Sequence, residues 1–87
     1  MNAEAQKLKV LFTKLFDSQG IKGKKVEIEE KNLNFAINIK VDSNQSLRDI
    51  RIILRTFDQI IMMTKNNYES ELELYTPYLT LYLDKYD

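Results

Sequence analysis

The chain has 87 residues, which suits one compact domain and is too short for two domains with separate cores. Thirteen Lys and Arg balance thirteen Asp and Glu, so the formal net charge is zero and does not draw the chain as a whole to nucleic acid or to an anionic membrane. Because this sequence holds neither Cys nor His, it excludes disulfides, zinc-finger ligation, thiol catalysis and histidine acid–base chemistry.

The N-terminal and apolar segments predict a soluble cytoplasmic protein with no membrane partner. Residues 1–5 lack a basic stretch followed by an apolar one, so we expect no secretory signal. Residues 60–63 form the longest apolar run, far shorter than the roughly 20 residues that a membrane span needs. Abundant Lys, Ile and Asn with scarce Ala, Gly and Pro indicate AT-rich codons, which suit a low-GC bacterium, an archaeon or one of their viruses.

A first helix is predicted over residues 2–19. Apolar side chains recur there at spacings of three and four residues and form one stripe, made of Leu8, Leu11, Phe12, Leu15 and Phe16. Gly20 follows the stripe, and glycine adopts the left-handed conformation of a helix C-terminus without steric cost. We therefore expect the helix to end there, with residues 21–25 as a connector.

Residues 26–41 predict a β-hairpin, because apolar and polar side chains alternate along them. The inward set comprises Val26, Ile28, Leu33, Phe35, Ile37, Ile39 and Val41, and the outward set includes Glu27, Glu29 and Lys40. Lys31 and Asn32 are predicted as the turn, since Asn tolerates a positive φ.

A second helix is predicted over residues 47–64, with Ser46 as its N-cap and Asp49 three residues later, close to a capping box. Its apolar arc is broad and comprises Leu47, Ile50, Ile53, Leu54, Phe57, Ile60 and Ile61. Residues 65–67 close the helix.

The last segment repeats the strand pattern and predicts a second hairpin. Leu72, Leu74, Leu79, Leu81 and Leu83 are expected to face inward, and Glu69, Glu71, Glu73, Tyr78, Thr80 and Tyr82 to face outward. Pro77 lies between the two runs, and proline suits a turn, a bulge or an edge because it lacks an amide donor.

These elements predict an α+β fold: an αββαββ two-layer sandwich over residues 1–87, with a four-stranded, mainly antiparallel sheet and two helices on one face. Glu27, Ile28 and Glu29 match Glu71, Leu72 and Glu73 at an offset of 71 − 27 = 44 residues. An internal duplication with repeats 1–44 and 45–87 explains this match, and so does binary patterning alone.

The outward face of the sheet is the predicted partner-binding surface. It comprises Tyr75, Tyr78, Tyr82, Glu27, Glu29, Glu69, Glu71 and Glu73, with Asp84 beside them. Tyrosines are favoured anchors of protein interfaces, but Tyr and Glu also suit the solvated face of an antiparallel sheet. Stacking of nucleobases on these rings is disfavoured, because the carboxylates repel phosphate.

A basic surface offers an alternative function in nucleic-acid binding. It comprises Arg48, Arg51 and Arg55 on the second helix, and Lys22, Lys24 and Lys25 in the connector. A few such cations give weak, salt-sensitive contact with phosphate, whereas a solvated helix face explains the same residues without a ligand. We rank nucleic acid below protein as the expected partner.

A third surface could join two copies of the chain. Ile52 and Met63 project away from the main apolar arc of the second helix, and Val10 lies on the first helix. Such a strip predicts a homodimer, although single exposed apolar residues are common on monomers.

Catalytic signals are poor. The segment after Gly20 lacks the spacing of a phosphate-binding loop, and Asp42, Asp49 and Asp58 do not match a calcium loop. We therefore predict a protein that is not an enzyme and has no cofactor and no metal: a small protein-binding module acting through the sheet face and an edge strand. It would be a regulator, adaptor or inhibitor, and codon usage suits a phage or mobile-element accessory protein that blocks a host enzyme. A homo-oligomeric structural subunit is a further alternative.

Overall fold

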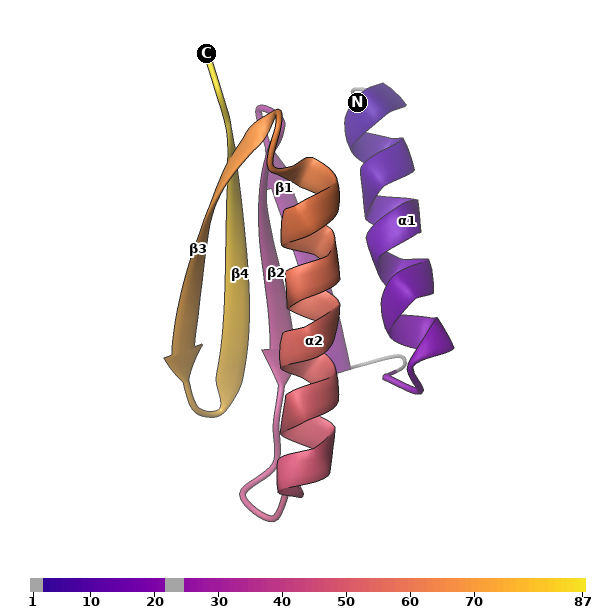
Figure 1. The fold of residues 1–87 in the computed structure, drawn as a ribbon, viewed down its shortest axis with the longest axis vertical. Helices are drawn as coiled ribbons and strands as arrows, with labels where there is room; N and C mark the ends of the chain where they lie inside the picture. Colours follow the sequence, from indigo (N-terminus) through magenta and orange to yellow (C-terminus); the bar gives the residue numbers. More distant parts are fainter. Residues whose placement is uncertain (1–2, 22–24) are drawn as a thin grey trace.

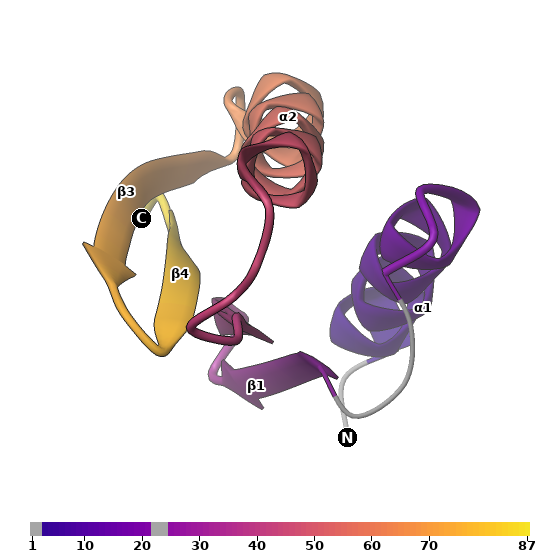
Figure 2. The ribbon, with the colours of Figure 1, turned by 90° about the horizontal axis from the view of Figure 1, so that it is seen from below.

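Two helices and four strands follow one another as the sequence predicts. The computed structural model describes residues 3–21 and 25–87. The elements are α1 (Ala3–Ser18), β1 (Val26–Lys31), β2 (Asn34–Lys40), α2 (Leu47–Thr64), β3 (Tyr68–Tyr75) and β4 (Tyr78–Lys85). Figures 1 and 2 show both helices on the same side of a single sheet. The predicted α+β two-layer fold is confirmed.

The sheet has the order β1-β2-β4-β3, and every neighbouring pair is antiparallel. The central pair, β2 and β4, joins the two hairpins, and β1 and β3 are the edges. Ile37 stands opposite Leu81 in this central pair, and both side chains are fully buried beneath the helices. The core therefore lies between the middle of the sheet and the two helices.

Helix α1 ends where glycine allows it to end. Gly20 has a φ of 82°, and the N–H of Ile21 donates to the carbonyl of Phe16 at 2.9 Å, which is the longer bond of a Schellman motif. Ile21 then packs against the core, as do the buried rings of Phe12 and Phe16. The predicted helix end at Gly20 is confirmed.

The turn of the first hairpin lies one residue later than predicted. Lys31 is the last residue of β1, and the turn is formed by Asn32 and Leu33, with φ values of 53° and 69°. A two-residue hairpin turn of this type needs a positive φ at both positions. Leu33 adopts it because its N–H donates to the Glu30 carboxylate at 2.9 Å and its side chain packs against the core.

Helix α2 begins at its predicted cap. The Ser46 hydroxyl accepts a hydrogen bond from the N–H of Asp49 at 3.1 Å, which satisfies a free donor in the first turn. Further along, Ile53, Phe57 and Ile60 are buried against the sheet. Neither helix in the described ranges is long and apolar enough to cross a membrane.

Two leucines of β3 are less buried than predicted. Leu72 and Leu74 lie on the helix side of the sheet, opposite Leu81 and Leu79, yet they are 45% and 52% exposed. They are only half covered because β3 is an edge strand with a neighbour on one side, whereas β4 is central. By contrast Tyr68, at the start of β3, is only 4% exposed and joins the core beside Phe35.

Candidate protein-binding face

Glutamates from both edge strands flank the side of the sheet turned away from the helices, which we call the outer face. The pairing forms two rows across the sheet: Glu27, Asn38, Thr80 and Glu73, and then Glu29, Ala36, Tyr82 and Glu71. Each row begins on β1 and ends on β3 with a carboxylate, while its middle is small, polar or aromatic. The registers of all three strand pairs therefore place acidic borders around Tyr82.

The centre of the outer face carries a polar side-chain contact between its two middle strands. The Thr80 hydroxyl donates to Oδ1 of Asn38 at 2.7 Å, which joins β4 to β2 through their side chains. Above this bond lies a shallow, open hollow of about 510 Å³, bordered by Glu27, Glu29 and Glu73 and by three tyrosines. A hollow this open suits a protruding side chain of a partner better than an enclosed small molecule.

The predicted tyrosines do meet at this hollow. Tyr75 and Tyr78 stand opposite each other on either side of the turn between β3 and β4, and Tyr82 lies further along β4. Tyr75 is 73% exposed, whereas Tyr82 is half-buried between its neighbours. The three rings thus extend from the end of the hairpin to the middle of the outer face.

Charge on the outer face is strongly unbalanced. Among the residues that the structure describes, it carries six acids, which are Glu27, Glu29, Glu69, Glu71, Glu73 and Asp84, and two lysines. Lys40 was predicted there, and Lys31 was missed because it was assigned to the turn. Both lysines lie at strand ends, so the centre of the face keeps a negative potential.

The phenol of Tyr82 responds to that potential. Its pKa is raised above the ordinary value of 10.0, first by the charge of Glu73, and then by partial burial and by the charges of Glu71 and Glu29. A hydrogen bond to Glu73 adds to the effect, because a neutral phenol is the donor. Carboxylates of both edge strands therefore act together on one central ring.

The basic residues lie elsewhere. Arg48, Arg51 and Arg55 are exposed on the side of α2 that faces solvent, where they border a shallow hollow together with Gln19. Lys25 forms an ion pair with Asp42, with 3.8 Å between Nζ and Oδ2. Lys22 and Lys24 lie outside the described residues. The structure thus keeps the arginines together and separates them from the acidic outer face.

The three residues considered for a dimer do not share one surface. Ile52 borders a cavity with Ile21, and Met63 borders a hollow with Leu8, so both lie on the flank of α2 that turns toward α1. Val10 is exposed on α1, and its two-residue separation from Leu8 places it about 200° away around the helix. A homodimer through these residues stays a prediction.

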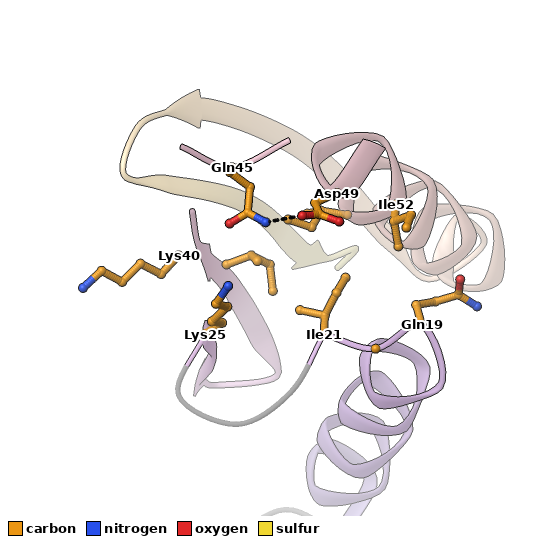
Figure 3. A pocket seen from close by; sticks show the side chains of 10 residues that line it. Gln19, Ile21, Lys25, Lys40, Gln45, Asp49 and Ile52 are labelled. Atoms are coloured by element: carbon orange, nitrogen blue, oxygen red, sulfur yellow. Dashed lines mark hydrogen bonds between the residues drawn. The ribbon is translucent and has the colours of Figure 1, made fainter. Parts of the chain in front are cut away.

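A small cavity of about 150 Å³ lies between the end of α1, the end of β2 and the start of α2. Figure 3 shows Ile21 and Ile52 facing each other across it, with Gln45 and Asp49 at its border. The Gln45 amide donates to Asp49 at 2.6 Å and accepts from the N–H of Asp42 at 3.4 Å. These bonds hold the loop before α2, which explains the polar border without a ligand.

Neither a search for metal-binding clusters nor comparison with known proteins points to a function. Within residues 3–21 and 25–87, no three acidic side chains are grouped so that they could hold a metal ion. In comparisons with known proteins, no family model, no curated protein and no solved structure matches the chain.

Proposed function

We propose that this chain is a small protein-binding module, a regulator, adaptor or inhibitor without enzymatic activity, whose outer face binds a basic surface of a partner protein. The observation that carries the proposal is the pair of cross-strand rows in which glutamates of β1 and β3 flank the central Tyr82. The proposal needs two properties of the face, anchoring and charge.

Anchoring comes from the tyrosines. A tyrosine ring gives a large contact area and loses little conformational entropy on binding, and such rings dominate the energetics of many interfaces. Tyr82 is already held between neighbouring strands, so less freedom is lost when a partner covers it. Tyr75 and Tyr78 extend the aromatic surface to the end of the hairpin.

Charge determines the class of partner. Six acids and two lysines on the described outer face favour a surface rich in Lys and Arg. The same carboxylates would repel a phosphate backbone and so disfavour nucleobase stacking on the tyrosines. Since Arg48, Arg51 and Arg55 lie on the opposite side of the molecule, they would not oppose such a partner.

Substitution of the two β4 tyrosines tests the proposal. We expect the double variant Tyr78→Ala and Tyr82→Ala to bind the partner at least about tenfold more weakly than the native chain, because truncating one central aromatic anchor commonly costs about 2 kcal/mol. The measurement is binding of the partner, captured from the native host, to immobilised chain with circular dichroism as the folding check.

Tyr86→Ala is the matched control, because Tyr86 is also exposed but lies beyond β4. It should leave capture unchanged. Equal binding by the native chain and a folded double variant would reject the outer face as the interface.

The exposed arginines of α2 support a second candidate, nucleic-acid binding. Arg48, Arg51 and Arg55 recur at spacings of three and four residues and form one stripe on the solvent side of the helix. Three phosphate contacts would give weak binding that falls steeply with salt. This candidate uses a surface opposite to the outer face. Charge-reversal variants on each surface therefore distinguish the two proposed functions.

A further inference from the structure

Strand β3 leaves one of its two edges open. It pairs with β4 along its whole length, and in the described part of the chain no strand pairs with it on the other side. The open edge is eight residues long, against six for β1 at the far end of the sheet. An open edge presents backbone N–H and C=O groups in the spacing that another strand needs.

The helix side of this edge is apolar and incompletely covered. Leu72 and Leu74 are about half exposed there. Helix α2 turns Ile52 toward α1, so Ile50 and Leu54, about 200° around the helix from Ile52, lie on the flank away from α1. Figure 2 shows β3 on the far side of α2 from α1. Ile50 and Leu54 both pack against the core and are only partly buried. A strand added to β3 would therefore find apolar side chains on this side.

The outer-face side of the same edge is acidic. Glu69, Glu71 and Glu73 alternate with Ser70, Leu72 and Leu74, and all three glutamates are exposed. A strand that pairs with β3 places every second side chain directly beside this row. This edge is therefore complementary to a strand with alternating side chains, apolar on the helix side and cationic on the outer-face side.

A second copy of the chain does not meet this requirement. If two β3 strands pair antiparallel about Leu72, then Glu71 of each copy stands opposite Glu73 of the other, because 71 + 73 = 2 × 72. Shifting the pairing to centre on Glu71 places Glu71 opposite itself and Glu69 opposite Glu73. Like charges directly opposite each other destabilise a strand pair, so the glutamates disfavour self-pairing.

We infer that the open edge of β3 receives an extended segment of the partner protein in which Lys or Arg alternates with apolar residues, and that this segment adds to the sheet as a fifth strand. The inference rests on the proposed function and specifies the partner, since the glutamates of β3 belong both to the outer face and to the open edge. The cations of the segment face Glu69, Glu71 and Glu73, while its apolar residues cover Leu72 and Leu74.

Four synthetic peptides of the length of β3 test the inference. The first alternates Lys and Val, and the second has the same composition with its lysines in one block. The third and fourth are N-methylated versions of the first, one at alternate positions along one edge and the other at alternate positions along the other edge. Each is titrated into isotope-labelled native chain while backbone amide shifts are followed. We expect the alternating peptide to shift amides of β3 and to bind about tenfold more tightly than the block peptide.

N-methylation should weaken binding on one edge of the peptide and not on the other, because a single edge bonds to β3. Leu74→Lys should weaken the alternating peptide about tenfold and leave the block peptide unchanged. Met62→Lys is the matched control, since Met62 is also an exposed apolar residue but lies on α2. The N-methylated peptides keep the test valid should Leu74→Lys disturb the fold.

Equal affinity for the alternating and block peptides, or amide shifts on β1 in place of β3, would overturn the inference. If either result came with loss of partner capture in the Tyr78 and Tyr82 double variant, the outer face would remain the proposed interface and the role of the β3 edge would be rejected. If no peptide bound and capture were also unaffected, both would be rejected.

Discussion

Tyr68 is buried in the core although its side chain carries a polar hydroxyl. Its ring is 4% exposed and packs 6.0 Å from the Phe35 ring, and among the described residues its hydroxyl is the buried side-chain polar atom that lacks a hydrogen-bond partner. An unsatisfied buried hydroxyl costs about 1–3 kcal/mol. We therefore expect Tyr68→Phe to raise the free energy of unfolding by about 1 kcal/mol in urea denaturation, with Tyr86→Phe as the exposed control.

The same substitution should change how stability depends on pH. Burial raises the pKa of Tyr68 above 10.0, and the charges of Glu4 and Glu30 raise it further. The unfolded chain then loses this proton at a lower pH than the folded chain, so stability is intact below pH 10 and falls as pH rises through the folded pKa. The difference in the free energy of unfolding between Tyr68→Phe and the native chain should therefore widen above pH 10. A difference that stayed constant with pH would contradict this account.

At the scale of elements, the end of α1 depends on one backbone conformation. Gly20 has a φ of 82°, and a Cβ added there would meet nothing within 4 Å. The whole cost of Gly20→Ala is therefore conformational, and we expect a loss of about 1 kcal/mol in the free energy of unfolding. Thermal unfolding followed by circular dichroism measures it. Gly20→Asn should lose less, because Asn tolerates the left-handed region better than Ala.

Elements with a clear period were predictable, and so was the pairing within each hairpin, whereas the pairing of β2 with β4 was not. Alternation placed Ile37, Leu81 and Tyr82 on their observed faces because side chains of a strand alternate with period two. The turn was misplaced because Leu33, an unusual residue at positive φ, is held there by the nearby Glu30 carboxylate. Exposure of Leu72 follows from the strand order, which brings together residues far apart in the sequence and leaves no local signal.

The candidate site also has a part that the sequence predicts and a part that depends on strand pairing. Its tyrosines and glutamates were assigned to the outer face from alternation alone. The rows that give the face its acidic borders depend on the β2–β4 register, where Asn38 meets Thr80 across 42 residues of sequence. Lys31 was missed because the position of a turn decides whether a neighbouring residue belongs to a strand.

At the scale of the whole molecule, the zero net charge conceals two opposed surfaces, an acidic outer face and the arginine stripe of α2. Such a separation orients a charged partner before contact, and this steering acts mainly on the association rate. For a basic protein partner, Glu71→Lys should slow association about tenfold at low salt, an effect that shrinks as salt screens the charges. Arg48→Glu should leave that rate unchanged or raise it slightly.

Association kinetics at several salt concentrations, together with gel-shift assays on short DNA and RNA, complete the comparison. Nucleic-acid binding through α2 requires the reverse order, with Arg48→Glu as the damaging change and Glu71→Lys as the harmless one. Both residues are exposed, so each reversal acts on the surface and leaves the core as it is. If Arg48→Glu slowed the protein partner as much as Glu71→Lys, the two faces would not act separately, and the proposed orientation of the complex would be wrong.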